Sequence, residues 1–245
     1  VHTGSFSVAA DASLSFNANH EFLPGADIAG AGTLVFGSSG TRTVASTVTI
    51  GGDVTLRGTN DFTGGSFSRA GALIVTSGTT SIANAVTPTS VSINGTLDVA
   101  ADQQWPTLTI GGGALTGDGS VVVAETFTWT AGSVSGLGTL EIAPGATAGL
   151  TGTASKTVGR PILNRGTIDW PTGQLRFAGA VLTNEGSFTA GSPSGSFGIS
   201  GGQTNVFINL GSFTKTGATT LNFSTSSTTL PFVNEGTVVV TEGTL

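Results

Sequence analysis

The chain has 245 residues, of which 9% are charged, and a formal net charge of −6 at pH 7 without any run of basic residues. This charge makes nucleic acid and anionic membranes poor candidate partners. The absence of cysteine excludes disulfides and thiolate metal sites, and no apolar run is long enough to predict a membrane span. With 39 glycines and few helix-forming residues, the composition predicts an all-β chain.

A short phrase recurs along the chain. Upstream it has the form apolar-x-Gly-x-Gly-(Thr/Ser)-apolar, at residues 28–34, 115–121 and 134–140. Downstream it becomes Asn-x-Gly-(Thr/Ser)-apolar, which occurs four times. The four asparagines are Asn164, Asn184, Asn209 and Asn234. A fixed phrase at such regular intervals is typical of a solenoid, in which each coil packs only on its neighbours.

One glycine of each phrase serves as a marker of its coil. If all the markers occupy one position, they predict about ten coils of roughly 20–28 residues. Gly and Asn adopt positive φ more readily than other residues, so we expect a left-handed backbone at this corner, with Gly166, Gly186, Gly211 and Gly236 as corner glycines. The full set of markers is Gly32, Gly52, Gly71, Gly95, Gly119, Gly138, Gly166, Gly186, Gly211 and Gly236.

The residues that follow each marker glycine alternate between apolar and polar. Ile168, Phe188 and Val238 take the apolar position, and this period of two predicts a strand with one buried face. Two further short strands complete each coil. We therefore expect an all-β fold, a right-handed parallel β-helix in which residues 1–245 form one continuous β-solenoid. Neither end of the sequence shows a cap, which predicts that each end meets either flanking coils of a longer chain or another copy docked head to tail.

The run through residues 111–121 and 127–140 to the Asn-x-Gly-Thr coils resembles the Gly/Thr-rich β-solenoid repeats of large bacterial secreted and cell-surface proteins. These repeats are similar in style to autotransporter passenger domains and filamentous-haemagglutinin-type adhesins. The resemblance implies an extracellular or cell-surface fibre with a structural and adhesive role. It implies no catalytic residue, cofactor or metal, and its partners would be other copies, flanking coils, or cell-surface and matrix glycans.

The four asparagines predict a structural ladder. They occupy one position in four successive coils, so their side-chain amides should stack about 4.8 Å apart and bond to one another along the rod. The functional alternative is a row of exposed amides that binds glycan or ice.

Three residues are candidates for a glycan or cation face. Glu141 and Asp169 each lie three residues after a marker glycine, so we expect them about 5 Å apart on the outward side of adjacent coils. Two such carboxylates would suit Ca²⁺ or the cleavage of a glycoside. Trp105 precedes a proline at an expected corner and is the best candidate for an exposed aromatic ring. The alternatives are solvated acids, a packed Trp, and an ion pair between Arg165 and Glu185.

Thr-x-Thr pairs are the last feature with a functional interpretation, because flat threonine rows on β-solenoids can bind ice. Their offsets from the marker glycines drift, which argues against a common plane. The sequence therefore favours a non-enzymatic fibre protein, with a carbohydrate-binding or polysaccharide-cleaving β-helix as the alternative and an ice-binding solenoid as the lesser one. The pairs lie at residues 41/43, 47/49, 107/109, 126/128/130 and 214/216.

Overall fold

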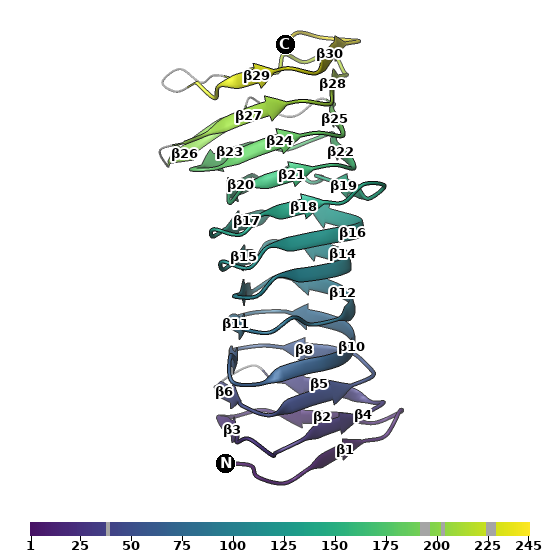
Figure 1. Ribbon diagram of the computed structural model, residues 1–245, viewed down its shortest axis with the longest axis vertical. Helices are drawn as coiled ribbons and strands as arrows, with labels where there is room; N and C mark the ends of the chain where they lie inside the picture. The colour runs from purple at the N-terminus through teal and green to yellow at the C-terminus, as the bar shows by residue number, and fades with distance from the viewer. Residues whose placement is uncertain (38–39, 192–196, 202–203, 224–228) are drawn as a thin grey trace.

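Strands stacked in parallel along one axis make up the rod in Figure 1. The computed structural model describes residues 1–37, 40–191, 197–201, 204–223 and 229–245, with only the backbone for 68–70. Every regular element within these ranges is a strand, and every strand pairing joins parallel strands of neighbouring coils. The prediction of an all-β parallel solenoid with three short strands per coil is confirmed.

Three faces surround the core, and the chain visits them in the order 1, 2, 3 in each coil. Face 1 is a ten-stranded sheet, whereas faces 2 and 3 are joined because β10 (Ser66–Val75), β14 (Gln103–Ile110) and β16 (Val121–Trp129) continue round the corner between them. Face 1 contains β3 (His20–Phe22), β6 (Thr41–Val44), β9 (Thr59–Phe62), β11 (Thr79–Ile82), β13 (Thr96–Val99), β15 (Ala114–Thr116), β17 (Gly132–Ser135), β20 (Lys156–Gly159), β23 (Leu175–Ala178) and β26 (Gly198–Gly201).

The other two faces contain the remaining strands. Besides the shared strands, face 2 contains β1 (Phe6–Val8), β4 (Ile28–Gly30), β7 (Thr47–Ile50), β18 (Leu140–Ile142), β21 (Ile162–Asn164), β24 (Val181–Asn184), β27 (Val206–Asn209) and β29 (Phe232–Asn234). Face 3 contains β2 (Ser13–Phe16), β5 (Thr33–Phe36), β8 (Val54–Leu56), β12 (Pro88–Ile93), β19 (Thr147–Gly149), β22 (Thr167–Trp170), β25 (Ser187–Ala190), β28 (Ser212–Lys215) and β30 (Thr237–Val240).

Coil length varies more than the sequence suggests. Thr79 pairs with Thr96 in the next coil, whereas Asn184 pairs with Asn209, which is a clearly longer step along the chain. The expected range of coil lengths is thus correct for the last coils and too long for the middle ones. Short coils are possible there because faces 2 and 3 merge into single long strands such as β14 and β16, which shortens the connection between the two faces.

The marker glycines do not share one corner, which corrects the sequence prediction. A Cβ on Gly32, Gly52 or Gly71 would meet the coil below at the corner between faces 2 and 3, where the four late markers also lie. Gly95 instead lies at the corner before face 1. Gly119 and Gly138 stack on each other at the corner between faces 1 and 2. The distance from one marker glycine to the next is therefore not one full coil wherever the two glycines lie at different corners.

The reason for glycine at the late corners is also different from the expected one. Positive φ occurs at the first glycine of the upstream phrases, Gly30, Gly117 and Gly136, where the late phrases have asparagine, so the expected left-handed backbone is present there. It is absent from Gly186, Gly211 and Gly236 and from every non-glycine residue within the described ranges, the ladder asparagines included. A Cβ on each of these three glycines would overlap the carbonyl oxygen of the marker glycine one coil below. Close approach of successive coils, not a left-handed backbone, excludes side chains here.

The core is a continuous column of apolar side chains that alternate with outward polar ones along each strand. In β22 and β25 the burial pattern has every second residue inside, as the sequence predicts. Trp105, Trp129 and Trp170 are all fully buried. Trp105 is therefore a core residue, and its expected exposure at a corner is wrong, because β14 continues through that position and turns the ring inward.

Candidate functional site

The asparagine ladder lies inside the rod, at the end of face 2. Side-chain Nδ2 of Asn164 donates to Oδ1 of Asn184, Asn184 donates to Asn209, and Asn209 donates to Asn234, each over 2.7 Å. The same nitrogens also donate to backbone carbonyls of the next coil, at Ser187 for the first step. Asn164, Asn184 and Asn209 have no exposed surface. The predicted ladder is present, and its buried amides cannot form an exposed row for glycan or ice.

The phrase Asn-x-Gly follows from this arrangement. The carbonyl oxygen of Asn164 accepts hydrogen bonds from the backbone N–H groups of both Glu185 and Gly186, and the pattern repeats in the next coils. Asparagine thus bonds the next coil with its side chain and its main chain at once. The ladder starts abruptly, because Asn164 lies in register above Ile142 and its buried Oδ1 has no donor.

Four buried cations stabilise other corners, and sequence reasoning missed them. Arg42, Lys156, Arg160 and Lys215 have no exposed surface, and their side chains donate to backbone carbonyl oxygens. Lys215, for instance, bonds the carbonyls of Gly191, Thr216 and Gly217. The signal that could have found Lys215 was its phase, because it takes an inward position two residues after Phe213.

Burial has an electrostatic consequence for three of these cations. Because desolvation penalises the charged form, it lowers the pKa of Lys156, and it lowers those of Arg42 and Arg160 as well. Arg160 donates to the carbonyls of Gly117, Gly119 and Gly138 and so ties the corners of two lower coils to its own. These contacts give the cations a structural role at crowded corners.

The expected carboxylate face does not form. Glu141 lies on face 2, where it pairs with Val122 and Leu163, whereas Asp169 lies on face 3, where it pairs with Gly149 and Thr189. The two are not neighbours in register, because their marker glycines belong to different corners. With Trp105 buried as well, the three nominated residues do not make one site.

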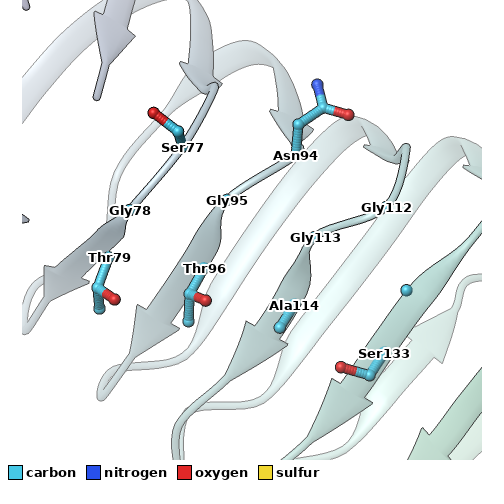
Figure 2. A pocket seen from close by; sticks show the side chains of 11 residues that line it. Ser77, Gly78, Thr79, Asn94, Gly95, Thr96, Gly112, Gly113, Ala114 and Ser133 are labelled. Atoms are coloured by element: carbon cyan, nitrogen blue, oxygen red, sulfur yellow. The ribbon is translucent and has the colours of Figure 1, made fainter. Parts of the chain in front are cut away.

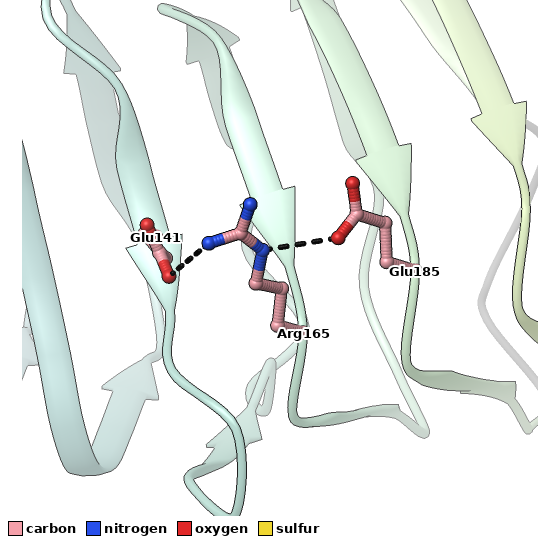
Figure 3. A network of polar contacts seen from close by, with 3 residues as sticks. All are labelled: Glu141, Arg165 and Glu185. Carbon is pink, nitrogen blue, oxygen red and sulfur yellow. Dashed lines mark hydrogen bonds and ion pairs between the residues drawn. The ribbon is translucent and has the colours of Figure 1, made fainter.

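Glu141 instead takes part in an ion-pair network that crosses three coils (Figure 3). Arg165 contacts Glu141 over 3.2 Å and Glu185 over 3.0 Å. The expected pair between Arg165 and Glu185 is confirmed. The hydrogen bond to Glu185 and the charges of both glutamates raise the pKa of Arg165. The network is solvent-exposed, so solvent screening keeps its contribution to stability small.

A shallow groove of about 490 Å³ runs along the corner before face 1. Figure 2 shows Ser77 and Asn94 on one side of it and Thr79, Thr96 and Ser133 on the other. Its floor is glycine, and a Cβ on these glycines would meet the backbone of the coil below. The groove has no charged or aromatic lining, and it follows from close packing at this corner. The floor consists of Gly78, Gly95, Gly113 and Gly132.

Comparisons with family models, with curated proteins and with solved structures found no match. The β-solenoid architecture therefore rests on the repeated strands themselves. Within the described ranges, no group of three or more His, Asp and Glu side chains is placed to hold a metal ion. The same ranges contain no helix that could cross a membrane.

The amino-terminal coil contains the two histidines of the chain. Nε2 of His2 lies 2.9 Å from Nδ1 of His20, and the ring of His2 packs on Phe22 at a centroid distance of 4.6 Å. Burial, followed by the charges of His2 and Arg42, lowers the pKa of His20. A hydrogen bond between two imidazoles needs one neutral ring as acceptor, so this contact is sensitive to protonation.

Proposed function

We propose that this chain is a stiff structural and adhesive rod of an extracellular fibre or cell-surface protein, without a catalytic role. The observation that carries the proposal is the unbroken bonding along the axis. Face 1 alone joins ten strands from successive coils, and the buried asparagine ladder adds side-chain bonds between the last coils. Bending such a rod would stretch hydrogen bonds in every coil, which suits a spacer or fibre.

The resemblance to bacterial autotransporter and haemagglutinin-type repeats supports an extracellular setting. Its adhesive partners would be surface or matrix glycans. The mostly uncharged exterior and the scarcity of charge overall are compatible with that setting.

We extend the proposal to end-to-end stacking. Within the described ranges, strands β29 and β30 each pair with one neighbouring strand, as do β1 and β2 at the other end, so backbone groups at both ends are open to another coil. The inward side chains at the two ends would also continue one another in a stack of copies, because Val238 and Leu14 belong to the same inward column of face 3. A second copy or flanking coils of a longer chain would complete the sheets.

Electron microscopy of the 245-residue chain, combined with its mass in solution, tests this proposal. Stacked copies would give unbranched filaments with an axial repeat of about 58 Å, from the twelve strands described on face 3 at about 4.8 Å each. Val238→Asp, which puts a charge at the open end, should abolish the filaments, whereas Thr183→Asp on the side of the rod should not. A monodisperse monomer at all concentrations would refute stacking of copies.

A further inference from the structure

Face 3 has two straight columns of outward hydroxyl groups, which the strand registers reveal. The first column contains only Ser and Thr in eight successive coils, and the second contains Ser or Thr in five of the same eight. We call these sixteen positions the hydroxyl face. Its strands from β12 to β30 stack on the right of Figure 1. The first column is Ser90, Thr107, Thr126, Thr147, Thr167, Ser187, Ser212 and Thr237, and the second is Ser92, Thr109, Thr128, Gly149, Asp169, Thr189, Thr214 and Val239.

This alignment corrects the sequence prediction that the Thr-x-Thr pairs share no coil position. The pairs at 107/109 and 126/128 lie in register on neighbouring coils, and the serine pair 90/92 continues the pattern in the coil before them. The apparent drift arose because offsets were counted from glycines of three different corners. The pairs at 41/43 and 47/49 do lie elsewhere, on faces 1 and 2.

The hydroxyl groups are available to a ligand. Every Ser and Thr of the hydroxyl face is at least partly exposed, and none of their side-chain oxygens bonds to another described residue. The buried asparagines behave in the opposite way, since each bonds to the next. The hydroxyl groups therefore do not bond to one another along the columns, so they remain able to bond to a ligand.

Strand propensity alone does not account for the columns. Threonine favours strands on every face, yet the matching outward column of face 2 contains Val122, Glu141, Leu163 and Ile208. Face 1 has two outward columns: one contains Asp61 and Asp98, and the other contains four successive threonines but continues with Ala114, so its hydroxyl run is half as long as that of face 3. Over its eight coils the hydroxyl face has a single charge, Asp169, and no aromatic ring.

The geometry is that of a two-dimensional lattice. Successive strands place equivalent hydroxyls about 4.8 Å apart along the rod, and alternate residues place them about 6.6 Å apart along each strand. Pairing between β22, β25, β28 and β30 continues without a register shift. Side-chain hydroxyls both donate and accept hydrogen bonds, as water does.

We propose that the hydroxyl face binds ice. A regular lattice of hydroxyl groups with spacings similar to the oxygen repeats of an ice plane can hold ordered water in register with the crystal. The lack of aromatic rings and of a charge cluster disfavours a polysaccharide, which is usually held by ring stacking. This binding goes beyond the proposed rod function and does not depend on stacking of copies.

Partition of the purified 245-residue chain into slowly growing ice, together with inhibition of ice recrystallisation, tests the proposal. The chain should be enriched in ice relative to a non-binding protein of the same size. Thr128→Tyr, in the middle of the hydroxyl face, should reduce enrichment to that background. Thr183→Tyr on face 2 is the matched control and should leave it unchanged. Asp169→Thr, which removes the one charge, should increase it.

Circular dichroism must show that each variant is folded, and Thr189→Tyr provides the same test in another coil if Thr128→Tyr does not fold. Exclusion of the unmodified chain from ice would overturn the proposal. Equal loss in Thr128→Tyr and Thr183→Tyr would overturn the assignment to face 3, and binding to crystalline cellulose without binding to ice would replace ice by a polysaccharide surface.

Discussion

Replacing Asn184 by alanine tests whether the asparagine ladder stabilises the rod. The substitution removes the amide that accepts from Asn164 and donates to Asn209. It leaves Oδ1 of Asn209 buried without a donor, whereas Nδ2 of Asn164 loses one bond and keeps its bond to the carbonyl of Ser187. At about 1–3 kcal/mol for the unsatisfied group and about 0.5–1.5 kcal/mol for the other lost bond, the free energy of unfolding should decrease by about 1.5–4.5 kcal/mol.

Asn234→Ala is the matched control, because Asn234 is exposed and has a ladder partner on one side only. Its loss should cost about 0.5–1.5 kcal/mol, the net value of one ordinary hydrogen bond. Urea unfolding followed by fluorescence of buried Trp170, in the same coil as Asn164, compares the two variants. Equal midpoints for Asn184→Ala and Asn234→Ala would refute the view that burial makes the ladder strong.

Three further predictions concern a corner, a proton and a surface charge. Gly186→Ala should destabilise the rod strongly because its Cβ would overlap a backbone carbonyl, whereas Gly112→Ala, with open space around its Cβ, should be nearly neutral in thermal unfolding. The pKa of His20 is lowered from 6.5 in the folded coil, so the unfolded chain takes up the proton first and stability falls as the pH decreases below 6.5. Hydrogen exchange of β3, corrected for intrinsic rates, should therefore accelerate between pH 7 and 5, and this extra acceleration should be absent in His20→Gln. Arg165→Ala should lower the urea unfolding midpoint only slightly at low salt and still less at high salt, and a large decrease at high salt would contradict an exposed network.

The sequence determined the features that depend on local alternation and on faithful repetition. Apolar residues at every second position predicted the inward and outward phases of β22 and β25. The phrases around Asn164, Asn184, Asn209 and Asn234 are similar enough to be aligned with one another from the sequence, so the ladder could be predicted before the fold was known. Both signals are carried within a few residues of the chain, where strand geometry alone decides which side chains face inward.

Only the tertiary structure decided how the less regular coils align. Glycine is required wherever successive coils approach closely, and this happens at three corners that look alike in sequence, so Gly95, Gly119 and Gly138 were assigned to the wrong one. That error placed Glu141 beside Asp169 and concealed the alignment of Thr109 with Thr128. Register between coils is set by backbone hydrogen bonds that span a whole coil, and no local pattern reports them. The chain by itself thus determined that it forms a solenoid, while packing between coils decided which side chains share a face.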